Sequence, residues 1–169
     1  MSNLVPTEII ANKIFLIRGQ KVMLSTDLAT LYKVEVRALV QAVKRNIKRF
    51  PEDFMFQLSN DEFGNLKSQI VISSWGGARR AKPYAFTEQG VAMLSSVLNS
   101  ERAIMVNISI MRVFSKLKQL ALSHSELLRK VEALERKYGE HDRKIEVVFA
   151  ILKKMLILPK PKKTGKIGF

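Results

Sequence analysis

A seven-residue apolar repeat in the C-terminal third is the feature that most restricts how this chain folds. With Leu117 at position a of the heptad, ten of the twelve a and d positions from Leu117 to Met155 are apolar or tyrosine. A repeat sustained over more than about three to four heptads indicates a coiled coil. The residues expected at its interface are Leu117, Leu120, Leu127, Val131, Leu134, Ile145, Val148 and Leu152.

Charges beside this repeat favour a parallel homodimer. Lys130 and Lys137 occupy g positions, where they would face Glu135 and Asp142 at the e positions of a partner helix. Gly139 leaves a second possibility open, because glycine inside a helix costs about 1 kcal/mol relative to alanine. The alternative to the parallel coiled coil is therefore an antiparallel hairpin that turns at Gly139.

The preceding part of the chain predicts a small mixed domain. Residues 14–17 and 21–24 are rich in β-forming side chains and flank Gly19, which suits the tight turn of a β-hairpin. Further strands are expected at 54–58, 70–72 and 84–86. The predicted fold class is α+β, with a small mixed domain over 1–112, a coiled-coil helix over 113–157 and a basic tail over 158–169.

Two neighbouring helices are predicted within this domain. The first covers 27–32 after a cap at Ser25 or Thr26, and the second covers 35–50 until Pro51 stops it. A short first helix, a tight turn and an amphipathic second helix are typical of a helix-turn-helix. Three later helices are expected. The first begins at the capping box of Ser59 and Glu62, the second is capped by Thr87 and runs to about Leu98, and the third is capped by Ser100.

The chain carries a large positive charge. Lysine and arginine number 29 against 15 aspartate and glutamate, which gives a net charge of +14. Such an excess implies a polyanionic partner, and double-stranded DNA is the leading candidate. The apolar residues of the second predicted helix lie on one side, which we expect to be buried: Val36, Leu39, Val40, Val43, Ile47 and Phe50. The opposite side is cationic and amide-bearing, and the loop before residue 84 is also cationic. We expect DNA contacts from Arg37, Gln41, Lys44, Arg45, Lys48, Arg49, Arg79, Arg80 and Lys82.

The residue types argue against several other classes of protein. With no cysteine and only two histidines, the chain has no disulfide framework and no thiolate zinc site. It has none of the common phosphate-loop, serine-hydrolase or zinc-protease motifs, so we expect neither an enzyme nor a bound cofactor. No apolar run reaches the ~20 residues of a membrane helix. We expect a cytoplasmic protein associated with the nucleoid of a bacterial host.

Several segments together resemble a known DNA-binding module. Residues 17–22 read IRGQKV, 27–34 read DLATLYKV, 42–58 read AVKRNIKRFPEDFMFQL and 84–98 read YAFTEQGVAMLSSVL. They are similar to the KilA-N type of DNA-binding domain of phages and prophages, in its ORF-six-N branch. The resemblance implies a compact α+β module of phage regulatory and antirepressor-like proteins. Lys33 stands where this pattern leads us to expect glycine.

These observations lead to one expected function and two alternatives. The expected function is sequence-specific DNA binding by a phage-type regulator that is dimerised through its C-terminal helix. The first alternative is an antirepressor-like protein that captures another regulator. The second is a Mg²⁺-dependent nuclease, whose metal would be bound by carboxylates drawn from Asp27, Glu52, Asp53, Asp61, Glu62 and Glu88.

Overall fold

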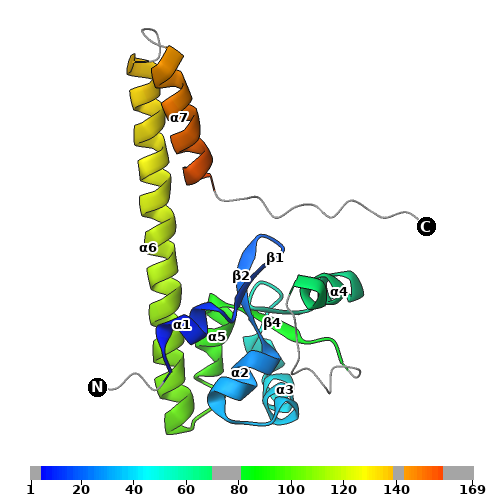
Figure 1. Cartoon of the computed structure of the whole chain (residues 1–169). Helices are drawn as coiled ribbons and strands as arrows, with labels where there is room; N and C mark the ends of the chain where they lie inside the picture. The colour runs from blue at the N-terminus through cyan, green and yellow to red at the C-terminus, as the bar shows by residue number, and fades with distance from the viewer. Residues whose placement is uncertain (1–4, 70–80, 139–142, 158–169) are drawn as a thin grey trace, which may run out of the picture. The chain divides into compact units, whose positions relative to one another are not determined.

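The computed structural model describes residues 5–69, 81–138 and 143–157 and confirms the predicted α+β class (Figure 1). The chain divides into two compact units, Met1–Ser115 and Lys116–Phe169. In the part of the chain that the structure describes, the first unit contains a four-stranded sheet with its helices, and the second contains the C-terminal part of a long helix and one further helix. Within the described residues, none of the helices has both the length and the apolar character needed to cross a membrane.

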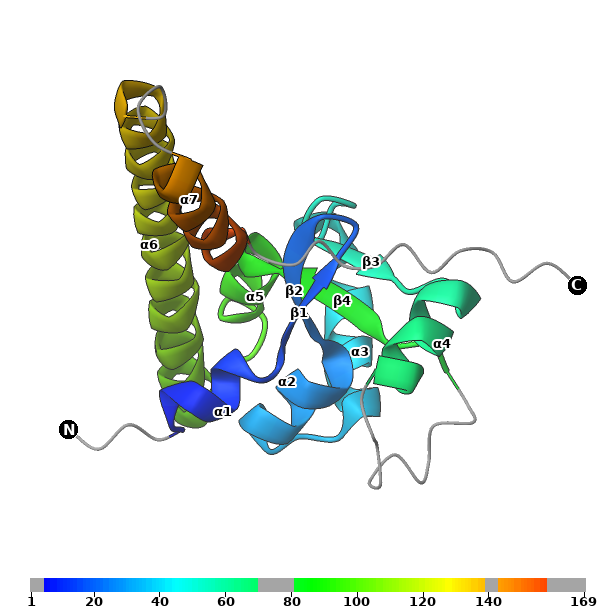
Figure 2. The same ribbon diagram turned by 45° about the horizontal axis from the view of Figure 1, so that its top comes forward.

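The sheet is antiparallel throughout, with the strand order β1-β2-β4-β3 (Figure 2). The predicted hairpin is confirmed: its two strands pair in register, and Arg18 and Gly19 both adopt positive φ in the turn, at 53° and 73°. Two consecutive residues with positive φ fit the right-handed twist of paired strands. The strands are β1 (Ile14–Ile17), β2 (Gln20–Leu24), β3 (Met55–Gln57) and β4 (Tyr84–Thr87). The strand expected at 70–72 lies outside the described residues.

Helices α2 (Ser25–Tyr32) and α3 (Val36–Arg45) form the expected neighbouring pair. The predicted cap at Ser25 or Thr26 is wrong, because the helix begins at Ser25 and no side chain caps it. The Ser25 hydroxyl instead accepts a hydrogen bond of 3.1 Å from the Tyr84 amide, which joins the start of α2 to the start of β4.

The capping box before α4 (Asn60–Gln69) is confirmed. The Ser59 amide donates to the Glu62 carboxylate at 2.7 Å, and the Glu62 amide donates to the Ser59 hydroxyl at 3.2 Å. This reciprocal pairing satisfies two amides that the first turn of a helix leaves without partners. Leu66 of α4 joins a core cluster that also contains Val22, Leu24, Leu58 and Ala85.

Helix α5 (Glu88–Leu94) begins as predicted but ends four residues before Leu98. Its cap is Thr87, whose hydroxyl accepts from the Gly90 amide at 3.4 Å and donates to the Asp53 carbonyl at 3.0 Å. Gly90 lies against the chain just before β3, so closely that a Cβ there would be 2.1 Å from the Phe54 carbonyl oxygen. Only glycine fits this crossing.

Two further helices complete the first unit, α1 (Thr7–Ala11) and the N-terminal part of α6 (Glu101–Tyr138). The predicted cap at Ser100 is confirmed, since its hydroxyl accepts from the Ala103 amide at 3.1 Å. The start of α6 is joined to α2, because Arg102 donates to the Leu31 carbonyl at 3.0 Å and Tyr32 donates to the side chain of Asn107.

The predicted unbroken coiled-coil helix over 113–157 is wrong. Helix α6 ends at Tyr138, and α7 (Arg143–Leu156) runs back along it, so the second unit is the antiparallel hairpin that Gly139 left open (Figure 1). Two contacts fix this pairing: Lys153 with Glu135, and His124 Nε2, which donates to the Leu156 carbonyl at 2.6 Å. A heptad repeat does not distinguish the two arrangements, because both bury side chains spaced by seven.

Candidate nucleic-acid interface

Helix α3 has a buried side and an exposed cationic side. Leu39 and Val43 are almost fully buried, while Arg37, Gln41 and Lys44 are exposed. At ~100° per residue, the three exposed residues lie on one side of the helix. The structure therefore places these three residues, which were predicted to contact DNA, in one row along α3, and Arg45 is exposed next to them.

The predicted continuation of this row is only partly correct. We expected α3 to run to Phe50, but it ends at Arg45, and Lys48 and Arg49 belong to a separate 3₁₀ turn, η1 (Ile47–Arg49). Both side chains are exposed. They extend the cationic surface beyond the helix but do not share its helical register. Arg49 also donates to the Ser96 hydroxyl at 3.3 Å, at the end of α5.

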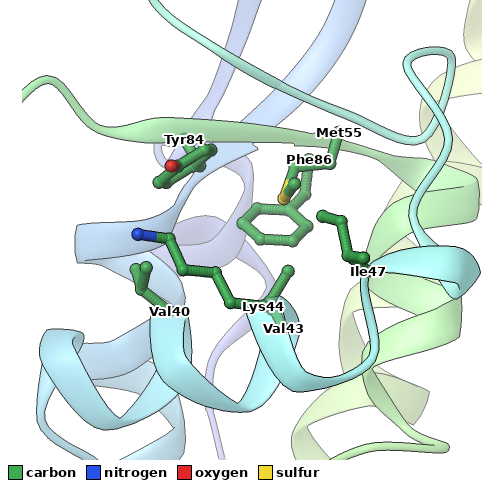
Figure 3. A pocket seen from close by; sticks show the side chains of 7 residues that line it. All are labelled: Val40, Val43, Lys44, Ile47, Met55, Tyr84 and Phe86. Atoms are coloured by element: carbon green, nitrogen blue, oxygen red, sulfur yellow. The ribbon is translucent and has the colours of Figure 1, made fainter.

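An apolar hollow of about 100 Å³ lies between α3 and the sheet (Figure 3). We expected Ile47 in the core with the other apolar residues of the second helix, but it is 52% exposed and borders this hollow. The expectation for Val36 is also wrong, since it is 38% exposed. The remaining lining residues are Val40, Val43, Lys44, Met55, Tyr84 and Phe86.

Lys44 crosses this hollow. Figure 3 shows its methylene chain over the apolar lining and its amine extended toward Tyr84. A lysine that rests its stem on apolar surface keeps its ammonium in water while its position is restricted. The hollow thus gives Lys44 a defined direction, which the sequence pattern did not reveal.

The start of β4 lies next to this part of α3. Tyr84 lines the same hollow as Lys44, and Lys82 precedes it by two residues. The backbone here is fixed, because the Lys82 carbonyl accepts from the Gln57 amide group at 3.2 Å. Lys82 is half-buried. The other two loop residues predicted to contact DNA, Arg79 and Arg80, lie outside the described residues.

Lys33, which stands where the family pattern has glycine, lies in the turn between α2 and α3. Lys33 adopts the left-handed conformation, with φ 56° and ψ 46°, so the position does require the geometry that glycine adopts most easily. The turn is closed by the Val34 amide, which donates to the Ala29 carbonyl at 3.0 Å. Ala29 is 1% exposed, which lets α3 lie close to α2.

Polar contacts fix α2 within the first unit. Asp27 is largely buried and pairs with Lys13 at 3.1 Å. Burial raises the pKa of the Asp27 carboxyl, and Lys13 acts in the opposite direction. Burial also raises the pKa of the Tyr32 hydroxyl, which stays neutral and bonds Asn107. These contacts make α2 a fixed support for α3.

Two of the carboxylates considered for a metal site have structural partners. Glu62 binds Arg18 through two hydrogen bonds of 2.7 and 3.1 Å, and Arg18 lies 4.2 Å from the centre of the Phe56 ring. The hydrogen bond from Arg18 lowers the pKa of Glu62 to about 2. Asp27 is paired with Lys13, as described above. Among the residues that the structure describes, no group of three His, Cys, Asp or Glu side chains is placed to bind a metal ion.

Comparison with models of protein families identifies the family of the first unit. The family model of the ORF6N domain matches residues 12–97, which is half of the chain and runs from just before β1 to just after α5. The chain belongs to the ORF6N domain family. The resemblance to the ORF-six-N branch is thereby confirmed.

ORF6N is a phage-type domain family, and the matched range includes α3, η1 and the whole hollow. Every residue predicted to contact DNA lies inside the ORF6N domain, whereas the α6–α7 hairpin lies outside it. Searches of curated proteins and of solved structures give no match to the chain.

Proposed function

We propose that the ORF6N domain binds double-stranded DNA through the exposed side of α3 and that the chain is a regulator of phage or prophage type. The main support is the placement of Arg37, Gln41 and Lys44 on one exposed side of a helix whose opposite side is buried in the core. The net charge of +14 adds a favourable field for a polyanion.

The three side chains have complementary uses in a major groove. Arginine donates two hydrogen bonds to guanine, and the glutamine amide pairs with adenine. Lys44 supplies a directed ammonium for a phosphate or a guanine. Four surrounding cations would contact the DNA backbone and set the position of α3 without reading sequence: the exposed Arg45, Lys48 and Arg49, and the half-buried Lys82.

In this proposal α2 and α3 act as a helix-turn-helix, with α3 as the recognition helix. The contacts of α2 with β4 and with α6 support this role, because they hold the helix pair rigid. We propose no catalytic step. The chain would act by occupying an operator, and paired copies would suit a two-fold symmetric site.

Capture of another regulator is the second candidate. It is favoured by apolar side chains on the outer surface of the hairpin, such as Leu127 and Met155, which are 48% and 76% exposed. A pull-down from a lysogen separates the two functions. A stoichiometric repressor partner without an associated operator would favour capture, and enrichment of one DNA site would favour direct binding.

Selection from random duplexes with the full chain tests the proposal directly. We expect a preferred sequence to emerge and its affinity to fall steeply with salt, because each phosphate contact contributes about −0.9 to the slope of log K against log salt. Single-stranded and double-stranded RNA of the same sequence serve as competitors. Failure to enrich any sequence, together with binding that ignores salt, would refute the proposal.

A further inference from the structure

The α6–α7 hairpin uses only part of the heptad repeat for its own packing. The buried and half-buried side chains of the hairpin occupy a and e positions, with the exception of Lys153 at position b. Val131 is 8% exposed, and it lies between His124 and Glu135, whose contacts with Leu156 and Lys153 mark the seam. The buried and half-buried positions are Leu117, His124, Leu128, Val131 and Glu135 on α6, and Ile145, Phe149, Lys153 and Leu156 on α7.

A second set of apolar residues lies outside this seam. On α6 the d residues Leu120, Leu127 and Leu134 are 56%, 48% and 47% exposed. On α7 the d residues Val148 and Met155 are 55% and 76% exposed, and the neighbouring residues Ile151 and Leu152 are 54% and 39% exposed. These seven residues are called the outer face below. Five of the eight residues predicted to mediate dimerisation belong to it.

Helical geometry places both rows on the same side of the hairpin. In each helix the d and g positions lie about a quarter turn back from the a and e positions that form the seam. The two helices face one another and run antiparallel. On each helix the exposed apolar row is rotated about the helix axis by the same angle and in the same sense from the seam. Because the helices are antiparallel, the row of α6 and the row of α7 lie on the same side of the hairpin; in a parallel pair they would lie on opposite sides.

The outer face is large and aliphatic. Seven side chains exposed by 39–76% amount to several hundred Å² of apolar surface. This approaches the ~800 Å² per partner of a standard stable interface. A nucleic acid or an acidic peptide gains nothing from aliphatic side chains, so the matching occupant is another apolar helical surface.

We propose that the outer face is covered by the same face of a second copy of the chain, giving an antiparallel four-helix bundle. A second copy carries the same apolar rows at the same heptad spacing, so two faces related by a two-fold axis match one another by construction. The continuous repeat then has a physical reason, because each helix contributes one seam within the chain and, through its d residues, a second seam between chains, to which α7 adds Ile151 and Leu152. Only the consequence for DNA, that two ORF6N domains act on one site, rests on the proposed function.

Sedimentation of the full chain without DNA tests this inference. L127E/I151E places a carboxylate on each row of the outer face. The matched control is L122E/A150E, because Leu122 and Ala150 are exposed on the same two helices at f positions, which point away from the outer face. We expect the natural chain and the control to sediment as dimers at micromolar concentration, and L127E/I151E to dissociate at least 100-fold more easily.

Circular dichroism shows whether each variant keeps its helices. A monomeric natural chain would overturn the inference, as would an L127E/I151E chain that dimerises as tightly as the control. A natural chain that is monomeric alone but pairs with a different protein through Leu127 would also overturn it. None of these results touches DNA binding, so failure of the bundle and failure of the proposed function remain distinguishable.

Discussion

The two units of this chain differ in how completely they bury their apolar side chains. In the first unit, large residues such as Tyr32, Phe86 and Ile110 are at most 2% exposed. Among the described residues of the hairpin, Val131 alone is almost fully buried, and Leu134 beside it is 47% exposed. The first unit therefore supplies its own core, whereas the hairpin has one closed seam and one apolar face that the described residues leave exposed.

The largest effect is expected where the first unit is packed most closely. Gly90→Ala places a Cβ 2.1 Å from the Phe54 carbonyl oxygen, so α5 and the chain before β3 must separate. We expect a loss of at least about 3 kcal/mol in the free energy of unfolding, which outweighs the helix propensity of alanine. Urea denaturation followed by circular dichroism measures it.

Gly64→Ala is the matched control for this prediction. Gly64 also lies in a helix, but nothing would come within 4 Å of its Cβ. Alanine there should stabilise the chain by about 1 kcal/mol. Equal effects of the two substitutions would show that the first unit is less closely packed than described.

Truncating each side of the hairpin separates its closed seam from its open face. Val131→Ala removes buried methyl groups and should cost about 1–2 kcal/mol of hairpin stability at any protein concentration. Leu134→Ala should cost little in dilute protein and more as the concentration rises, because its exposed side chain is covered only in the dimer. Thermal unfolding at several concentrations measures both. Concentration-independent losses in both variants would contradict the open face.

Relief of backbone strain at the α2–α3 turn should raise the free energy of unfolding by a smaller amount. Lys33→Gly relieves a left-handed conformation at φ 56° and should stabilise the first unit by about 1 kcal/mol. Lys33→Ala removes the same charge but keeps the strain, and we expect no gain from it. Denaturation midpoints of the two variants provide the test, and a gain from alanine would point to charge rather than backbone strain.

The smallest expected effect depends on pH. Because the pKa of Glu62 is lowered from 4.5 to about 2 in the folded state, its pairing with Arg18 stabilises the fold above pH 4.5. This contribution is lost as the pH falls from about 4.5 to 2. Glu62→Gln should therefore be slightly less stable than the natural chain at pH 7 and equally stable near pH 2, because glutamine keeps the capping geometry. A difference that persists at pH 2 would contradict this account.

Local signals in the sequence predicted much of the fold. The hairpin at Gly19, the capping box of Ser59 with Glu62 and the caps at Thr87 and Ser100 all depend on residues within a few positions of one another. The exposed row of Arg37, Gln41 and Lys44 was also predictable, because helical spacing decides it.

Features that depend on distant contacts were not predictable. The end of α3 at Arg45 follows no breaker residue, and the exposure of Ile47 depends on how far β4 lies from α3. The heptad repeat specified a seam but not whether its partner was another chain or the same one. A sequence pattern indicates which side chains are buried, but it does not indicate which segment or chain packs against them.

The DNA affinities of two charge-matched double variants show whether the α3 surface or the overall charge binds DNA. R37A/K44A removes two cations from α3, and K21A/R112A removes two exposed cations from β2 and α6 of the same unit. We measure binding of the selected duplex by fluorescence anisotropy over a range of salt concentrations. We expect R37A/K44A to bind the duplex at least 100-fold more weakly than the natural chain, with a salt slope smaller by about 1–2, while the affinity of K21A/R112A stays within a few-fold of the natural chain. Equal losses in the two variants would show that charge alone, and not the α3 surface, binds the DNA.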